Sequence, residues 1–595
     1  MAAETIALAR KGGGWLLEAS APSEVFSPDR FTEEHKLIGQ TATEFMAAEV
    51  LPNIERMESK DWEFSRGLLR QCGELGLLGA DAPERFGGVH LDKVSSLLIS
   101  ERLALSASFA TTFGAQVNLA MLAILLFGTE AQKQKYVPRL VTAEIVGAYG
   151  LSESGAGSDA LNAKTKAMRQ ADGSYLISGE KMWISNGGFA DLYIVFAKVD
   201  GEHFTAFIVE KAWPGVSSGK EEHKMGLLGS STTPVILQEV HVPAENVLGE
   251  VGKGHRVAFN VLNFGRLKLG FMCAGGCIGV IGESARYAAT RQQFGHPIAS
   301  FGAIKHKIGE MTARTYALES MLYRTAGLLD EAIAANRTSP DDMTAVLAAG
   351  EEYAIEASIA KIAGSEVCDF VLDENIQVHG GNGFVRDYPA ERHYRDARVN
   401  RIFEGTNEIN RLLIPGLMMR RALKGDLPLI QAAKKLQDEL MAPPQAGTRG
   451  LSGPLADEQQ TVAGLKKVAL AVLGVAMLKY GQKVADEQEV LMALADIAIA
   501  TYQAESALLR ALEASARSLA TAALQRDAAQ VFVNDAVALV EFSAKTALGA
   551  MADGDMLRTH LAALRRLLKA ALVNTIAMRR RLAEATVAKG AYLFR

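Results

Sequence analysis

The sequence predicts a mainly α-helical protein with a β domain in the middle of the chain. Helical periodicity is visible from Phe31 onward and again from Gly254 onward, whereas β-branched and aromatic residues at strand spacing fill the region between. A stretch rich in Pro, Gly and Ser then precedes a last Ala- and Leu-rich helical region. The expected order is therefore helical, β, helical, linker and helical.

The composition is that of a large globular protein. The chain has 595 residues, of which 49% are hydrophobic and 22% are charged, so it can form several domains with a sizeable core. Its net charge of -5 argues against a nucleic-acid-binding protein, which usually carries a basic surplus. Of the four cysteines, Cys273 and Cys277 are spaced for packing on one helix rather than for a metal site. We therefore expect reduced structural thiols and no metal.

The N-terminal residues lack the pattern of a signal peptide, because glycines at 12–14 interrupt the apolar stretch. The longest strongly apolar runs, at 124–127 and 468–478, look too short to span a bilayer. We expect a cytoplasmic protein that is soluble or at most peripheral to a membrane.

Patterning divides the chain into six regions. An irregular arm covers 1–30, with prolines as breakers. The regions that follow are a helical domain at 31–148, a β domain at 149–253, a helical bundle at 254–425, a linker at 426–458 and an extra helical domain at 459–595. Thr32 and Gly128-Thr129 mark helix boundaries in the first helical domain. In the last domain, 556–581 has an apolar and a basic stripe and is expected to be one amphipathic helix.

The β domain is expected to be an antiparallel sheet. Strands are predicted at 175–178, 192–199, 204–209 and 235–242. Asp172-Gly173 and Asp200-Gly201 are typical of hairpin turns. No long helix interrupts the strands, which disfavours a doubly wound dinucleotide fold.

Glu404 is the candidate for acid–base chemistry on which the rest of the interpretation depends. It follows Ile402 and Phe403 and precedes Gly405, which lets the backbone bend or a ligand approach closely. Poor hydration between apolar neighbours raises the pKa of a carboxyl group toward the range useful for a base at neutral pH. Thr406 or Asn407 is expected to cap the next helix. An ordinary loop glutamate before a capped helix fits the same residues.

Other segments combine glycines, hydroxyls, aromatic residues or arginine in ways that suit a bound cofactor or anionic ligand. These segments lie at 149–159, 181–188, 263–266, 291–298 and 377–384. The first is neither a P-loop nor a GxGxxG turn followed by a helix, so the usual nucleotide-phosphate motif is absent there. Arg266 is expected to open a helix and grip an anionic ligand. Each segment alone also fits a structural role, such as a polar glycine turn or a core tryptophan.

Taken together and in this order, the segments resemble the motifs of the acyl-CoA dehydrogenases. The matching stretches are YGLSESGAGSD, KMWISNG, RQQFGHPI, QVHGGNGF and IFEGTNEI. The resemblance covers about 31–423, and the extra helical region is similar to that of the very-long-chain members and their bacterial long-chain relatives. It implies the acyl-CoA dehydrogenase fold: an N-terminal helical domain, a β-barrel-like domain and a four-helix bundle, with FAD between the last two, plus the extra C-terminal domain.

The resemblance also implies roles for individual residues. Glu404 is expected to be the base that removes the thioester α-proton. FAD binding is implied for Tyr149, Leu151, Ser152, Gly157, Ser158, Trp183, Ser185, Arg291, Phe294, Gln377, Gly380, Gly381, Thr406, Asn407 and Glu408. Substrate binding is implied for Ser158, Asn263, Arg266, Phe403 and Gly405, with room for a long acyl chain at Gly114 and Ala115. Some members carry the base directly before the arginine of the other helix; the residue here is Gly265, which cannot act as a base.

The implied reaction is the α,β-dehydrogenation of long-chain acyl-CoA to trans-2-enoyl-CoA in fatty acid β-oxidation. Electrons are expected to pass to an electron-transfer flavoprotein, and the chain is expected to form a homodimer. Two other functions stay open: an acyl-CoA oxidase that uses oxygen, and a scaffold for respiratory-complex assembly. A peripheral membrane contact near 430–458 is a further alternative.

Overall fold

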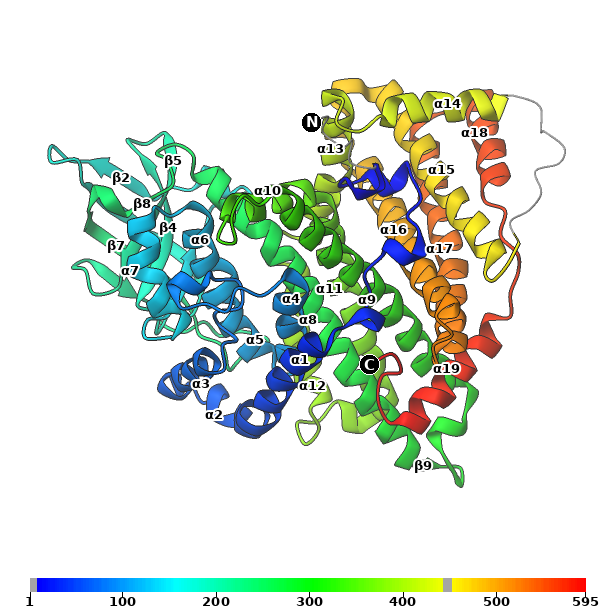
Figure 1. Cartoon of the computed structure of the whole chain (residues 1–595), viewed down its shortest axis with the longest axis horizontal. Coiled ribbons are helices and arrows are strands. Elements are labelled where there is room, and N and C mark those ends of the chain that lie inside the picture. The colour runs from blue at the N-terminus through cyan, green and yellow to red at the C-terminus, as the bar shows by residue number, and fades with distance from the viewer. Residues whose placement is uncertain (1–7, 442–451) are drawn as a thin grey trace.

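The structure, a computed structural model, describes residues 8–441 and 452–595. Residues 1–7 of the predicted arm and 442–451 of the predicted linker lie outside this description. The β domain occupies one end of the molecule, the extra helical domain the other, and long helices lie between them (Figure 1). The predicted fold class, mainly α with a middle β domain, is confirmed.

The two helix boundaries predicted in the N-terminal helical domain, at Thr32 and at Gly128-Thr129, are observed. Thr32 precedes α1, and its side-chain oxygen accepts a hydrogen bond from the His35 N–H. Thr129 caps α7 in the same way, directly after Gly128 ends α6. The helices are α1 (Glu33–Phe45), α2 (Ile54–Glu58), α3 (Trp62–Glu74), α4 (Lys93–Arg102), α5 (Ala107–Gly114), the π-helical turn η9 (Ala115–Met121), α6 (Leu122–Phe127) and α7 (Glu130–Val141). They share a hydrophobic core with the β domain.

The β domain is one eight-stranded sheet of order β6-β7-β3-β2-β4-β5-β8, with β1 also paired to β4. Its strands are β1 (Gly147–Gly150), β2 (Lys166–Arg169), β3 (Tyr175–Ser185), β4 (Leu192–Val199), β5 (His203–Glu210), β6 (Val216–Ser218), β7 (Thr232–Val242) and β8 (Val247–Leu248). Both predicted hairpin turns join antiparallel pairs, β2 to β3 and β4 to β5. The expectation of a purely antiparallel sheet is wrong, because β1 and β2 run parallel to β4.

The bundle is built on two long helices, α8 and α11, that pack along each other. Its elements are α8 (Gly254–Thr290), the hairpin β9 (Gln292–Gln293) and β10 (His296–Pro297), α9 (Gly302–Asn336), α10 (Met343–Glu352), α11 (Ala354–His379), α12 (Ala390–Ala397), the 3-10 turn η14 (Arg398–Arg401) and α13 (Asn407–Lys424). The prediction that Arg266 opens a helix is wrong, because Arg266 lies well inside α8.

The extra domain packs on the bundle and shares its core. Its helices are α14 (Leu429–Met441), α15 (Ala456–Tyr480), α16 (Gln488–Ala516), α17 (Ala522–Met551), α18 (Gly554–Leu567) and α19 (Thr575–Lys589). Part of the predicted linker is therefore helix α14. The single helix predicted at 556–581 is wrong: α18 ends at Leu567, and the Asn574 side chain accepts a hydrogen bond from the Ala577 N–H to start α19.

The described part of the N-terminal arm, 8–30, contains only short 3-10 turns, yet it is packed rather than free. Trp15 is buried, and its Nε1 donates to Glu356 Oε1 on α11 at 3.0 Å. Asp29 accepts from Arg510 Nε on α16 at 2.7 Å. The arm therefore ties the bundle to the extra domain, and it crosses both in Figure 1.

Three helical segments are long and apolar enough to cross a membrane, which corrects the expectation that the apolar runs are too short. They are Ala107–Phe127, Gly254–Thr290 and Ala456–Asp486. Their apolar windows are 78%, 78% and 61% buried inside the protein, so their hydrophobicity serves the two cores described above.

Candidate functional site

Glu404 lies in the turn between η14 and α13, in a backbone conformation that few side chains adopt. Its φ is 57°, and Gly405 follows with a φ of 78°. The turn is held from both sides: Arg266 Nε donates to the Glu404 carbonyl at 3.2 Å, and Asn410 Nδ2 donates to the Gly405 carbonyl at 2.8 Å. Thr406 then caps α13 by accepting from the Ile409 N–H, as predicted. A strained residue fixed this firmly is typical of a functional position.

The Glu404 carboxyl group is directed into the protein against α8. A Cβ atom at Gly265 would lie 2.7 Å from Glu404 Oε2, which is closer than real Cβ contacts. Oε2 is buried and has no hydrogen-bond partner among the described residues. Gly265 is therefore the residue that makes room for the carboxyl group.

Burial raises the pKa of Glu404 to about 7, although nearby cations oppose the shift. These cations are Arg266 on α8 and Lys361 on α11. Burial also lowers the pKa of Lys361 to about 8. Tyr149 on β1 faces the same group, and its hydroxyl is buried without a partner among the described residues. The site thus holds a carboxyl group that can gain or lose a proton near neutral pH.

The 151–158 loop and the end of β3 form one unit beside this carboxyl group. The Met182 N–H donates to the Ser152 carbonyl at 2.9 Å, and buried Lys181 pairs with Glu153 at 2.7 Å. Trp183 follows a bulge in β3, has a φ of 59° and is 57% exposed. Asn186 Nδ2 ties this end of the strand to the Thr112 carbonyl of α5 at 3.0 Å. An indole held open to one side offers a flat surface to a ligand.

The glycines of the loop border empty space. Cβ atoms added at Gly155 or Gly157 would meet nothing within 4 Å. Ser158 is exposed beside them, and Leu151 and Tyr149 are buried behind them. We call the surface formed by Gly155, Gly157, Ser158 and the exposed indole of Trp183 the cradle; its open backbone, hydroxyl and flat ring suit a flat, polar-edged ligand.

The remaining predicted cofactor residues lie elsewhere. Arg291 follows the last residue of α8, and from position 266 to position 291 the helix rises roughly 37 Å at about 1.5 Å per residue. Phe294, 90% exposed, lies in the adjoining hairpin. Gln377, Gly380 and Gly381 lie at the same end of the bundle, where the Tyr287 hydroxyl donates to the His379 carbonyl at 3.2 Å. Within one chain, the structure therefore divides the predicted cofactor residues between the Glu404 region, beside the interior of α8, and the C-terminal end of α8.

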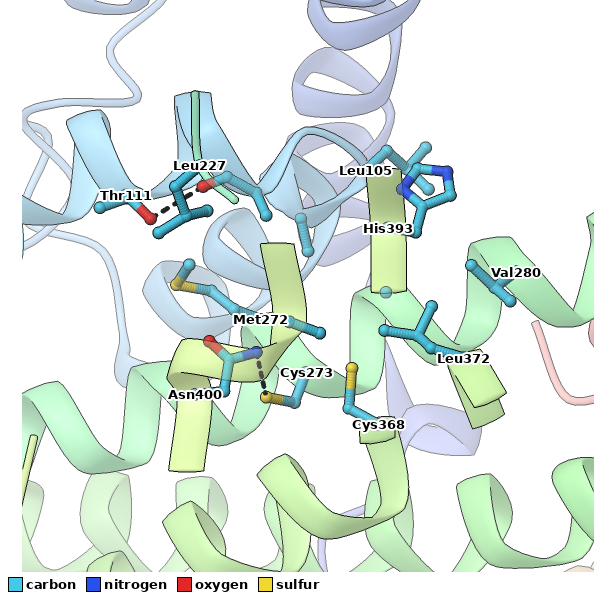
Figure 2. A pocket seen from close by; sticks show the side chains of 14 residues that line it. Leu105, Thr111, Leu227, Met272, Cys273, Val280, Cys368, Leu372, His393 and Asn400 are labelled. Atoms are coloured by element: carbon cyan, nitrogen blue, oxygen red, sulfur yellow. Dashed lines mark hydrogen bonds between the residues drawn. The ribbon is translucent and has the colours of Figure 1, made fainter. Parts of the chain in front are cut away.

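A cavity lies beside α8, roughly two to four turns beyond Gly265. Its volume is about 40 Å³. Thr111 comes from α5, Met272 and Cys273 from α8, Cys368 from α11 and Asn400 from η14 (Figure 2). Gly276 on α8 and Ala107 on α5 also line it. Gly114 and Ala115 do not line it, although they end and follow the same helix α5.

Comparison with known proteins decides the family. Acyl-CoA dehydrogenase domains match at 32–144 (N-terminal), 148–240 (middle), 252–417 (C-terminal) and 464–566 (a second C-terminal domain). A "Probable acyl-CoA dehydrogenase" of Bacillus subtilis is 48% identical over 577 residues, which is 96% of each chain. This chain belongs to the acyl-CoA dehydrogenase family.

Two further acyl-CoA dehydrogenases match over most of the chain. The human "Very long-chain specific acyl-CoA dehydrogenase, mitochondrial" is 36% identical over 494 residues, covering 78% of this chain and 71% of that protein. The crystal structure of an acyl-CoA dehydrogenase complexed with FAD from Bacillus anthracis has a TM-score of 0.96 and 47% identity, covering 98% of this chain and all of that one. The predicted family and fold, with the extra helical domain, are confirmed.

As an acyl-CoA dehydrogenase the chain is a flavoprotein oxidoreductase with FAD as its cofactor, as predicted. The observed site fits that group. The open cradle at Gly155 and Gly157, the exposed indole of Trp183 and the unpartnered Tyr149 hydroxyl suit a flat ring system with polar edges.

Sequence reasoning did not identify two side chains that shape the site. Lys361 Nζ donates to Asn407 Oδ1 at 2.6 Å beneath the Glu404 turn. Asn410 Nδ2 contacts the carbonyls of Glu404, Gly405 and Thr406. The only signal for Lys361 was a single charged residue within the apolar run 357–363.

Proposed function

We propose that this acyl-CoA dehydrogenase converts long-chain acyl-CoA to trans-2-enoyl-CoA in fatty acid β-oxidation, with Glu404 as the base. The observation that carries the proposal is the buried Glu404 carboxyl group, with a pKa of about 7 and an unpartnered Oε2. A base of this pKa is substantially ionised at neutral pH and still strong enough to take a proton.

A thioester α-proton is only weakly acidic, so its removal also needs donors aimed at the carbonyl oxygen. The amide N–H of Glu404 donates to no acceptor among the described residues and can serve as one donor. Arg266 and Asn263 are joined by a 3.2 Å hydrogen bond on α8 and are proposed to orient the CoA part beside Ser158, Phe403 and Gly405. When bound, FAD supplies the acceptor for the hydride that leaves the β-carbon.

The cavity on α8 supports a preference for long acyl chains. From Gly265 to Gly276 the helix rises roughly 16 Å, and to Val280 roughly 22 Å. The cavity at that distance is lined largely by small and apolar residues, and we propose that the distal part of an acyl chain whose thioester lies at Glu404 opens and enters it. A short acyl group would stay near Gly265 and would not reach the cavity.

Gly276→Leu is expected to block that path. A Cβ at Gly276 would meet only Cys368 Sγ, at 3.7 Å, so the leucine can enter the cavity without displacing backbone. Activity on palmitoyl-CoA is expected to fall about tenfold or more, because a few methylene groups lose their pocket. Butyryl-CoA, assayed on the same variant, serves as the internal control, and an equal loss on both substrates would contradict the assignment of the cavity.

The test of the function itself is anaerobic mixing of the holoenzyme with acyl-CoAs of graded length, followed by the flavin absorbance. Bleaching that is greatest for long chains is expected. Subsequent reoxidation by an electron-transfer flavoprotein, faster than by air, would support that protein as the acceptor; rapid reoxidation by air would favour the oxidase. No bleaching with any thioester would refute the proposal and favour the scaffold function.

The division of the cofactor residues supports a homodimer. Arg291, Phe294, Gln377, Gly380 and Gly381 lie too far along α8 to reach the cradle of their own chain, so we propose that they contact FAD bound to a second copy. Phe294 and Phe384 are 90% and 85% exposed at that end, as expected for a surface covered by a partner.

Phe384→Asp is expected to convert the dimer to a monomer and to weaken FAD retention, because a charge would replace a buried aromatic side chain at the interface. Sedimentation velocity and the ratio of flavin to protein measure both effects. Leu478→Asp, at an equally exposed leucine of the extra domain, is the matched control and should stay dimeric. A wild-type protein that sediments as a monomer with full FAD would exclude the shared site.

A further inference from the structure

A chain of charged hydrogen bonds joins the extra domain to the turn that carries Glu404. Asp496 belongs to α16 of the extra domain, and its Oδ1 accepts from Arg411 Nε at 2.8 Å. Arg411 lies on α13, the helix that begins directly after the turn. Its two other nitrogens donate to both carboxylate oxygens of Glu366 on α11, at 2.7 and 2.9 Å. Arg411 is thus held in one orientation by three bonds to two domains.

The same carboxylate holds the first residue of α13. Glu366 Oε1 accepts from Asn407 Nδ2 at 3.0 Å. Asn407 is buried, and its Oδ1 accepts from Lys361 Nζ at 2.6 Å. Asn407 is three residues from Glu404, and Glu404 and Gly405 are both left-handed, which leaves the turn little freedom. Any movement of Asn407 is therefore passed to the Glu404 carboxyl group.

We propose that Asp496 is a positioning residue, through which the extra domain fixes the catalytic turn by way of Arg411, Glu366 and Asn407. Asp496 touches neither the cradle nor the Glu404 carboxyl group. Without the Asp496 carboxylate, Arg411 is bound to Glu366 alone. The Arg411 guanidinium and the Glu366 carboxylate can then shift together, and the turn that carries Glu404 loosens. The inference rests on the proposed function, since it assumes that Glu404 is the base.

The geometry of the turn sets the direction of the expected effect. The pKa of Glu404 is high because the carboxyl group is buried against Gly265, while Arg266, Lys361 and Tyr149 are the charged or titratable groups that face it. A looser turn admits water, which lowers that pKa and misplaces the base. Both changes reduce kcat, and neither requires loss of substrate binding.

The experiment compares Asp496→Asn with Glu513→Gln in the FAD-loaded holoenzyme. Glu513 is a matched control, because it lies on the same helix and pairs with Arg30 at the same distance, 2.8 Å, away from the turn. Asp496→Asn is expected to lower kcat on the order of tenfold and to shift the acidic limb of the pH–rate profile to lower pH, with KM unchanged. Asp496→Glu, which keeps the carboxylate, is expected to restore both kcat and the position of the acidic limb toward their wild-type values.

The wild-type enzyme is measured first, so that the two proposals fail separately. If none of the acyl-CoA thioesters bleaches the wild-type flavin, the proposed function is refuted. If wild type turns over normally, the positioning role is refuted by an Asp496→Asn variant with unchanged kcat and pH profile. It is also refuted if Glu513→Gln changes them equally, or if Asp496→Asn lowers only the melting temperature. In those cases the pair merely holds two domains together.

Discussion

Replacing Glu404 by glutamine is expected to reduce turnover by about a thousandfold or more, because no other side chain at the site can take the α-proton. Gly265 has no side chain, the Tyr149 hydroxyl has a pKa raised well above its usual range, and Arg266 stays a cation. Lys361 Nζ is engaged by Asn407 Oδ1, to which it donates at 2.6 Å. Anaerobic stopped-flow of the loaded variant with palmitoyl-CoA measures the bleaching rate directly. Retained FAD absorbance shows that the site is otherwise intact.

In the wild-type enzyme, kcat/KM is expected to rise with pH through about 7 and then level off, because only the ionised carboxyl group accepts the proton. The glutamine variant should lose this limb. An unchanged rate in Glu404→Gln, or a wild-type limb near the pKa of an ordinary exposed carboxyl group, would contradict the role of Glu404.

The same substitution is expected to stabilise the protein at alkaline pH. The folded-state pKa of Glu404 lies above its unfolded value of 4.5, so folding becomes less favourable as pH rises from 4.5 toward 7, and the cost is constant above that. The difference between 4.5 and about 7 corresponds to roughly 3 kcal/mol. Glu404→Gln should therefore raise the melting temperature at about pH 8 and have a smaller effect at about pH 5. Glu439→Gln, at an exposed carboxylate of α14, is the control and should show neither change.

Local features of the fold were predictable where a few adjacent residues determine them. Thr32, Thr129 and Thr406 cap the expected helices, and Asp200-Gly201 joins two expected strands. The break between α18 and α19 was missed because the apolar stripe continues through it, although Asn574 carried the capping signal. A periodic pattern shows that a helix is compatible with a segment, and a cap shows where one begins.

Long-range arrangement was the harder part. The cofactor motifs were recognised as a set, but the sequence does not show that α8 runs unbroken from Arg266 to Arg291 and so separates them. The roles of Lys361 and of the Asp496–Arg411 pair could not be predicted either. Their partners are distant in sequence and meet only when α11, α13 and α16 pack. The resemblance to a family singled out Glu404 as the candidate base, because its neighbours alone also fit an ordinary loop glutamate. The means of holding Glu404 in place was not predictable.

Gly265→Ala is expected to lower turnover about a hundredfold while the protein keeps its fold. The new methyl group would lie 2.7 Å from Glu404 Oε2 and 3.0 Å from its carboxyl carbon. Either the helix backbone that carries the methyl group or the Glu404 carboxyl group must therefore move. Backbone at 265 lies in the middle of α8 and is fixed by helical hydrogen bonds, whereas the carboxyl group is the end of a flexible side chain. The carboxyl group therefore moves, and a displacement of about 1 Å suffices for a loss of this size.

The matched control is Gly416→Ala on α13, where an added Cβ meets nothing within 4 Å. Both substitutions replace a helical glycine, and each gains up to about 1 kcal/mol of helix propensity. The control should bleach at the wild-type rate with equal or higher thermal stability. Gly265→Ala should bleach slowly at an unchanged FAD content, and its pH–rate limb should move, because the displaced carboxyl group has a different hydration. If Gly265→Ala bleached at the wild-type rate, the close packing of Glu404 on α8 would have no part in catalysis.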